Sequence, residues 1–217
     1  MPSYVAFFDL DKTLIRTNSG VTMIREALRV GMLPWGKLAG GLYLALLNRF
    51  GLKEQFYVVD ELAKWLKGKS YQSIQALSGT IFSKSLVHAL RPEMEAEIRL
   101  HKDRGAAVVI LSSALAPVCS AVASHLRLDG VICSEFEIKE GLFTGRPVGK
   151  ICYAAEKLRR MEAYCTAFQY KLPDAYYYAD AISDYDALQA TGHPVCVHPD
   201  RALRKIAKKN GWEIRDC

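Results

Sequence analysis

The 217-residue chain lacks several features that would place it in a specialised class of protein. It has no apolar run of the roughly 18–20 residues that cross a bilayer. Its start, Met1-Pro2-Ser3-Tyr4, lacks the basic character of a signal peptide. With 50% hydrophobic and 24% charged residues, its composition is that of a globular protein. Disorder, collagen and coiled-coil rods are therefore excluded, and we expect a cytoplasmic protein.

Paired or clustered cysteines are also missing. The six cysteines form no CxxC pair and no Cys/His cluster with zinc-binding spacing. Four of them lie in apolar or mixed stretches, where a free cysteine behaves as a small buried hydrophobic residue. We therefore expect structural thiols, which suits a reducing compartment.

The positive charge is unevenly distributed. The chain has 29 Lys and Arg against 23 Asp and Glu, and residues 16–86 hold ten of the basic and four of the acidic side chains. Such a segment could attract nucleic acid, anionic lipid or a phosphorylated small molecule, or could simply be a solvated helical surface. Because the chain has no arginine-rich run and no RNP-like aromatic motif, we expect no nucleic-acid partner.

Short apolar β-prone runs alternate with helical stretches outside residues 16–86. The expected strands are 4–9, 106–112, 131–136, 175–179 and 194–198, and the expected helices 92–102, 117–126, 150–164 and 200–209. Residues 136–145 are typical of a β-hairpin that turns at Glu140-Gly141. Strands that alternate with helices predict an α/β fold with a parallel sheet and crossover helices.

Residues 16–86 contain helical stretches near 21–31, 53–67 and 71–88 but no convincing strand. We predict an all-helical insertion here. The expected domains are a core of residues 1–15 and 87–217 and a helical domain of residues 16–86.

Three of the expected strands end in polar residues. Asp9 and Asp11 follow the first, Ser112 and Ser113 end the second, and Asp180 and Asp184 follow a later one. Ligands of parallel sheets bind at the carboxyl ends of the strands. Two carboxylates that lie close together repel each other unless a cation offsets their charge. Mg²⁺ prefers oxygen ligands and could do so.

The stretch FFDLDKTLI resembles the first motif of the haloacid dehalogenase-like (HAD) hydrolase superfamily, an apolar strand followed by DxDx(T/V)(L/V). The resemblance implies that Asp9 is the nucleophile that forms an aspartyl-phosphate. Asp11 would be the general acid and base. Bound Mg²⁺ would mask the charge of the phosphate.

The family's other motifs follow in order. Ser112 takes the place of the second-motif hydroxyl, and Ser113 stands beside it as a further substrate contact. The stretch around residues 141–161 resembles the phosphoserine phosphatase-like subfamily IB. There the motif lysine falls five residues after a position often held by cysteine, which selects Lys157, with Lys150 as the alternative.

The stretch YYYADAISDYDAL resembles the fourth motif, (G/S)DxxxD, with Ala179 where glycine is common. Asp180 would be a direct metal ligand and Asp184 would act directly or through water. The resemblance thus implies four metal-site residues: Asp9, Asp11, Asp180 and Asp184.

The resemblance also implies a Rossmann-like core with a first-type (C1) helical cap. Phosphoserine phosphatases carry a glutamate nine residues after the nucleophile, where this chain has Asn18. An uncharged amide forms no ion pair with an ammonium group. We therefore predict that Asn18 contacts a substrate other than phosphoserine.

The predicted function is Mg²⁺-dependent hydrolysis of a small-molecule phosphomonoester. A phosphotransferase with an alcohol acceptor is one alternative. Another is a lipid-phosphate phosphatase, because the basic cap contains LAGGLYLALL with Trp35 and Phe50 nearby. That segment would either pack the helices or line a lipid pocket, with peripheral contact to a membrane. A receiver-type signalling module is disfavoured because it lacks a cap. The oligomeric state stays open.

Overall fold

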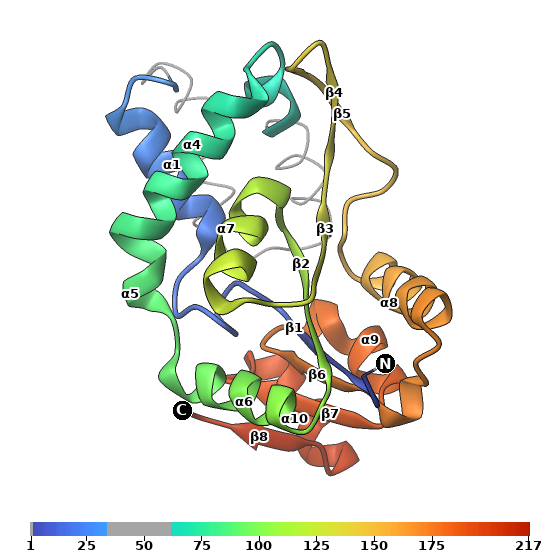
Figure 1. Ribbon diagram of the computed structural model, residues 1–217. Helices are drawn as coiled ribbons and strands as arrows, with labels where there is room; N and C mark the ends of the chain where they lie inside the picture. The colour runs from blue at the N-terminus through green and yellow to red at the C-terminus, as the bar shows by residue number, and fades with distance from the viewer. Residues whose placement is uncertain (1, 34–61) are drawn as a thin grey trace.

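A six-stranded sheet forms the centre of the protein (Figure 1). The structure is a computed structural model that describes residues 2–33 and 62–217. The strands are all parallel, in the order β3-β2-β1-β6-β7-β8. They are β1 (Val5–Phe8), β2 (Ala107–Leu115), β3 (Gly130–Ser134), β6 (Tyr176–Ala179), β7 (His193–Val197) and β8 (Glu213–Arg215). The predicted α/β fold is confirmed.

Helices cover both faces of the sheet. They are α6 (Pro92–Asp103), α7 (Ala116–Leu126), α8 (Ala155–Phe168), α9 (Tyr185–Ala190) and α10 (Arg201–Asn210). Helices α6 and α7 pack on one face, and α8, α9 and α10 on the other. Ala6 and Phe8 of β1 point to the first face, and Val5 and Phe7 to the second. A strand buried on both faces has a continuous apolar sequence, as β1 does.

Strand β1 ends between two neighbours. Phe8 pairs with Ile110 of β2 and with Tyr178 of β6. The rings of Phe8 and Tyr178 are stacked with their centroids 4.3 Å apart. Burying one such ring contributes about 1.5–3 kcal/mol. This packing fixes the ends of β1 and β6 side by side at one edge of the sheet.

The helices of the insertion lie beyond that edge (Figure 1). Among the described residues they are α1 (Ser19–Arg29), residues 62–66, α4 (Tyr71–Ile81) and the π-helical η2 (Phe82–Leu86), which α5 (Val87–Ala89) continues into the expected core. Helix α4 packs against α1 and against α7 of the core. The apolar stretch LAGGLYLALL, Trp35 and Phe50 lie outside the described residues.

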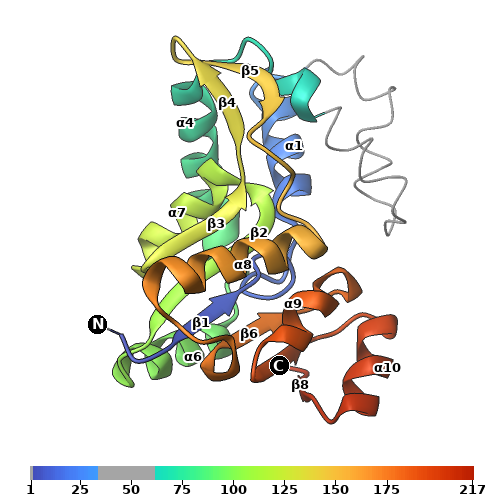
Figure 2. The same cartoon turned by 90° about the vertical axis from the view of Figure 1, so that its right-hand side faces the viewer.

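A β-hairpin joins the core to the far end of these helices (Figure 2). It consists of β4 (Phe136–Lys139) and β5 (Leu142–Pro147), so the predicted hairpin is confirmed. Backbone hydrogen bonds run from Gly68 N to Phe143 O (2.8 Å), from Phe143 N to Lys69 O (2.9 Å) and from Tyr71 N to Gly141 O (2.9 Å). The sequence did not predict this docking.

Two expected features of the secondary structure were wrong, the start of one helix and the nature of the C-terminal tail. The helix expected at 150–164 is α8, which begins at Ala155 and ends at Phe168. The preceding loop is held by a bond from Cys152 N to Ser134 Oγ (3.2 Å), and Ala154 has non-helical angles (φ 48°, ψ −127°). The tail expected after α10 contains the edge strand β8, a run too short and too charged to give an apolar pattern.

All six cysteines are free thiols, and five of them are buried.

The hairpin docking predicts an unequal response to alanine at two glycines. Gly145 and Gly141 both have positive φ (+80° and +77°). A Cβ on Gly145 would lie 2.8 Å from the carbonyl oxygen of Ala63, whereas a Cβ on Gly141 meets nothing within 4 Å. Gly141→Ala should cost about 1–2 kcal/mol for its backbone angle alone. Gly145→Ala should cost at least about 1 kcal/mol more, measured by urea unfolding. Equal losses in the two variants would contradict the close contact with Ala63.

Candidate active site

The chain turns back on itself directly after β1. Asp9 N donates to Tyr178 O (2.9 Å), which extends the ladder with β6 by one residue. The carbonyl oxygens of Asp9 and Leu10 then accept bonds from Leu14 N (3.3 Å) and Ile15 N (3.0 Å). The tight loop leaves the buried Asp9 carboxylate at the carboxyl edge of the sheet.

Three buried carboxylates meet at this edge. Asp9, Asp180 and Asp184 each offer an oxygen, and these atoms lie within 4.8 Å of one another. Asp180 directly follows β6, and Asp184 ends the 3-10 turn η4 (Ile182–Asp184) before α9. Asp200, the N-cap of α10, donates its N–H to Asp180 O (2.8 Å) and steadies the loop. A set of carboxylate oxygens suits a hard cation such as Mg²⁺.

A lysine ammonium group lies among these carboxylates. Lys157 Nζ is 2.9 Å from Asp9 Oδ1 and 2.5 Å from Asp184 Oδ1, and its side chain is buried. The lysine comes from the first turn of α8. Lys150 is exposed, and its backbone carbonyl accepts a bond from Arg160. Of the two candidate lysines, the structure brings Lys157 to the carboxylates.

One ammonium group does not balance three carboxylates. Burial alone would lower the pKa of Lys157, but Asp184 and Asp9 outweigh it and hold that pKa well above its usual range. Burial raises the pKa of Asp9, although Lys157 opposes the rise. Burial, together with Asp9 and Asp184, raises the pKa of Asp180 to about 8. The site therefore holds an excess of negative charge that a divalent cation would relieve.

Asp11 has different partners from the three carboxylates, although Asp9 and Lys157 still affect its pKa. Its Oδ1 accepts a bond from Ser19 N (2.8 Å) at the start of α1, and the residue is half-buried. The group of three acids that could share a cation does not include it, and the place of Asp11 in the metal site stays a prediction. Burial raises the pKa of Asp11 to about 6, against the effect of the Ser19 N–H.

The remaining predicted residues have different surroundings. Ser112 is buried and its Oγ accepts a bond from Ala114 N (3.3 Å), while Ser113 is exposed. Strand β2 does not end at Ser112 but runs on to Leu115, with a register shift after Leu111. Asn18 Oδ1 accepts a bond from Val21 N (3.0 Å) and caps α1. Its side chain therefore has a structural role that accounts for the amide.

Sequence analysis missed one side chain that reaches the site. The buried Tyr177 donates its hydroxyl to Asp184 Oδ1 (2.5 Å) and lies 3.2 Å from Lys157 Nζ. Because side chains alternate along a strand, Tyr177 points to the face that α8 covers. The alternation of side chains along β6 could have indicated this residue. With three consecutive tyrosines, however, the sequence does not show which of them faces the acids.

Comparisons with known proteins agree with this geometry. The family model described as haloacid dehalogenase-like hydrolase matches residues 6–189. Phosphoserine phosphatase SerB1 of Mycobacterium tuberculosis is 26% identical over 215 residues, which cover 97% of this chain and 70% of the relative.

Two solved structures share the fold. A protein with unknown function from Bordetella pertussis Tohama I has a TM-score of 0.88 at 21% identity and covers 100% of this chain and 99% of its own. A phosphoserine phosphatase in the form of a phospho-aspartyl intermediate analogue has a TM-score of 0.65 at 18% identity, with 99% and 93% covered.

The raised pKa of Asp180 predicts how the stability of the metal-free protein depends on pH. Folded Asp180 keeps its proton up to about pH 8, whereas an unfolded aspartate loses it near pH 4. Between these values the unfolded chain binds fewer protons, so this residue lowers stability as the pH rises. Urea unfolding in EDTA at pH 5 and pH 8 should show a decline that Asp180→Asn reduces by a few kcal/mol.

The matched control is Asp186→Asn, an exposed aspartate on α9. It should keep the pH dependence of the unsubstituted protein. If Asp180→Asn also keeps that dependence, the proton on Asp180 is not the cause.

Proposed function

The chain belongs to the haloacid dehalogenase-like hydrolase family and is a phosphatase of that family; from this premise we propose that it hydrolyses a phosphomonoester in two steps through an aspartyl-phosphate on Asp9. One observation carries the proposal. Oδ1 of the buried Asp9 carboxylate accepts a hydrogen bond from Lys157 Nζ within the group of three acids. Its second oxygen, Oδ2, is then the one that meets the substrate.

In the first step Asp9 Oδ2 attacks the phosphorus atom and the bond from phosphorus to the leaving oxygen breaks. Lys157 holds Asp9 Oδ1 at 2.9 Å and so limits rotation of the attacking carboxylate. The ammonium charge of Lys157 also offsets the charge that builds up as carboxylate and phosphate approach.

Asp11 supplies a proton to the leaving oxygen in that step. In the second step it takes a proton from a water molecule whose oxygen attacks phosphorus, which frees Asp9 and inorganic phosphate. A group with these two duties works best when its pKa is near the operating pH. The pKa of Asp11, raised by burial to about 6, supports this role.

Asp9, Asp180 and Asp184 are the residues that would hold Mg²⁺. Their oxygens form an all-oxygen donor set, and burial, together with the charges of Asp9 and Asp184, raises the pKa of Asp180. When bound, the ion would offset the charge of the phosphoryl group and so let a carboxylate approach it.

We infer that phosphoserine is not the preferred substrate. Where phosphoserine phosphatases have their glutamate, this chain has Asn18, whose side-chain oxygen caps α1. No ion pair to a substrate ammonium group is available from an amide. Ser113, exposed beside the buried Ser112, is available for contact with the phosphate ester.

The first test is phosphate release from a panel of esters with and without Mg²⁺. The panel holds phosphoserine, sugar phosphates, nucleotides, phosphocholine and lipid phosphates. We expect Mg²⁺-dependent turnover with phosphoserine below the best substrate in kcat/KM. Asp9→Asn should reduce kcat by on the order of 10³-fold or more, because it removes the nucleophile.

Asp186→Asn is the control for charge and should leave kcat within about twofold, since surface changes have small effects. Turnover that survives in Asp9→Asn would contradict the aspartyl-phosphate mechanism. Phosphoserine as the best ester would contradict the proposed selectivity.

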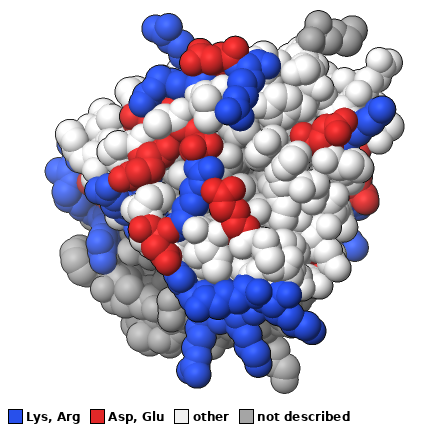
Figure 3. All heavy atoms as spheres, turned by 90° about the horizontal axis from the view of Figure 1, so that it is seen from below, with Lys and Arg blue, Asp and Glu red and all other residues white. Residues whose placement is uncertain are grey.

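A lipid phosphate at an anionic membrane is a second candidate, favoured by the surface of α10. On this helix Arg201, Lys205, Lys208 and Lys209 are exposed and fall on one side. They make no ion pair in the part of the chain that the structure describes. Figure 3 shows Lys and Arg side chains gathered at the lower edge of that view, where α10 lies.

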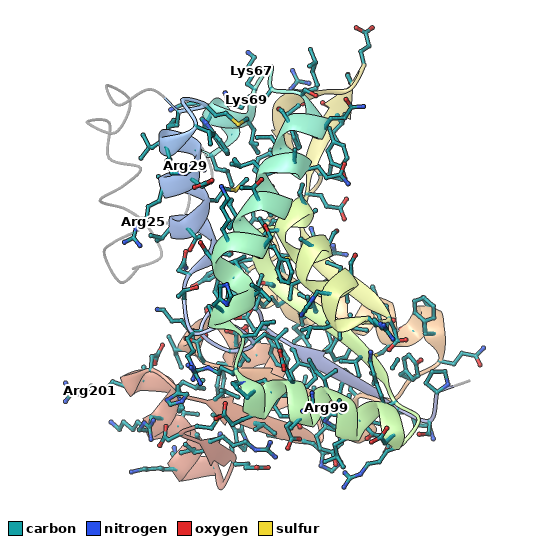
Figure 4. All side chains as sticks on the ribbon, turned by 60° about the vertical axis from the view of Figure 1, so that its left-hand side comes forward. Arg25, Arg29, Lys67, Lys69, Arg99 and Arg201 are labelled. Atoms are coloured by element: carbon teal, nitrogen blue, oxygen red, sulfur yellow. The ribbon has the colours of Figure 1, made fainter. Side chains whose placement is uncertain are left out.

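The helix begins close to the acidic site. Its cap Asp200 bonds the loop after β6 through Asp180 O and Ile182 N (2.9 Å), and Ile182 itself is an exposed apolar side chain. Figure 4 places Arg201 on the same side as Arg25 and Arg29 of α1. Among described residues no helix has the length and apolar character to cross a bilayer. Any membrane contact of these elements would be peripheral.

Co-sedimentation with vesicles tests this second candidate. Vesicles that contain phosphatidylserine should bind the protein at low salt, and binding should fall at about 0.5 M salt because surface charges are then screened. Changing Lys205, Lys208 and Lys209 to Gln should weaken binding by about 100-fold, at about 1 kcal/mol per lysine.

The control changes three exposed lysines elsewhere, Lys139, Lys150 and Lys171, to Gln. It carries the same net charge and should keep most of the binding. An equal loss in both triple variants, or no binding at low salt, would contradict a membrane role for α10.

A further inference from the structure

Tyr177 is a buried polar group of the acidic site that the steps above do not use. The residue is fully buried in β6, and its hydroxyl is the polar group at the end of the ring. It donates to Asp184 Oδ1 at 2.5 Å and accepts from Lys157 Nζ at 3.2 Å. The hydroxyl thus bridges the motif lysine and one of the three carboxylates.

The two oxygens of Asp184 have different surroundings. Oδ1 accepts two bonds, from Lys157 Nζ (2.5 Å) and from the Tyr177 hydroxyl (2.5 Å). Two donors satisfy the lone pairs of one carboxylate oxygen. Oδ2 has only a distant contact among the described residues, from Ser183 Oγ at 3.5 Å. Oδ2 is therefore the oxygen left for a cation.

We propose that Tyr177 is a positioning residue that fixes Asp184 with Oδ2 turned toward the cation site. It also gives the Lys157 ammonium group a third acceptor beside Asp9 and Asp184. The three bonds use all three N–H groups of the lysine. With every donor engaged, the ammonium group stays between Asp9 and Asp184.

A tyrosine suits this task better than a water molecule would. The terminal torsion of an aspartate is broad and roughly two-fold, so one bond leaves the carboxylate able to turn. A second donor carried by a rigid strand removes that freedom. The ring of Tyr177 is packed beneath α8, which holds the hydroxyl in place without ordering a solvent molecule.

The experiment compares two neighbouring tyrosines of the same strand. Tyr177→Phe removes the hydroxyl at Asp184, and Tyr178→Phe removes a hydroxyl that donates to Glu97 (3.0 Å) on the opposite face. Both side chains are buried and both bonds end on a carboxylate. Phenylalanine keeps each ring, so the core stays filled.

The readout is Mg²⁺ affinity without substrate, measured by calorimetry and by the shift in melting temperature on adding Mg²⁺. In Tyr177→Phe we expect the Kd for Mg²⁺ to rise about tenfold or more, as the loss of a hydrogen bond to a charged group allows. In Tyr178→Phe the Kd should stay within about twofold, even where the melting temperature in EDTA falls.

A double-mutant cycle with Asp184→Asn tests whether Tyr177 acts through that carboxylate. In the Asp184→Asn background Tyr177→Phe should have no further effect on the Kd. An unchanged Kd in Tyr177→Phe, an equal rise in Tyr178→Phe, or additive effects with Asp184→Asn would each overturn the proposal.

The inference rests on the proposed cation site but not on the proposed reaction. If the unsubstituted protein binds no Mg²⁺, the cation site and the role of Tyr177 fall together. If it binds Mg²⁺ but releases no phosphate from any ester, the reaction is overturned and the role of Tyr177 is judged by the Kd values alone.

Discussion

The ammonium group of Lys157 is the contact on which the rest of the site depends. It joins Asp9 and Asp184, which lie 148 and 27 residues away in the chain. Removing one partner of a buried ion pair costs roughly 3–5 kcal/mol because the other charge is left uncompensated. The carboxylates can be buried because the lysine compensates their charge. The buried lysine in turn stays protonated because the carboxylates lie beside it. Since one ammonium group faces three carboxylates, the arrangement that stabilises Asp9 still leaves negative charge that a cation could compensate.

The strand order brings these distant residues together. Strand β1 lies between β2 and β6, so Asp9, Ser112 and Asp180 approach one edge although long segments separate them. Helix α8 crosses the face to which Phe7 and Tyr177 point, and its first turn delivers Lys157 from that side. Parallel strands with crossover helices lead to this result because every strand ends at the same edge.

Much of this could be predicted from the sequence, because apolar strands followed by acids are a local signal. The parallel sheet and the acids Asp9, Asp180 and Asp184 at its strand ends follow from such signals, and Lys157 was selected by the resemblance to subfamily IB. The start of α8 and the bond that Asp11 accepts from Ser19 N could not be predicted, because the first depends on a bond to the Ser134 hydroxyl and the second on how the loop after β1 folds back. Tyr177 was missed because its role depends on which face of β6 it occupies.

The hairpin constrains how the helices beyond the sheet edge can move. Near the site, the segment that leads into the helices and the segment that returns from them are joined by two backbone bonds. These run from Arg16 N to Ala89 O and from Arg91 N to Leu14 O. At the far end the hairpin adds backbone bonds to residues 68–71. Each such bond contributes about 0.5–1.5 kcal/mol to stability, and at the base of the hairpin Val148 N bonds Glu135 O. Through these bonds β4 and β5 are attached to the helices beyond the sheet edge, although they follow β3 in the chain.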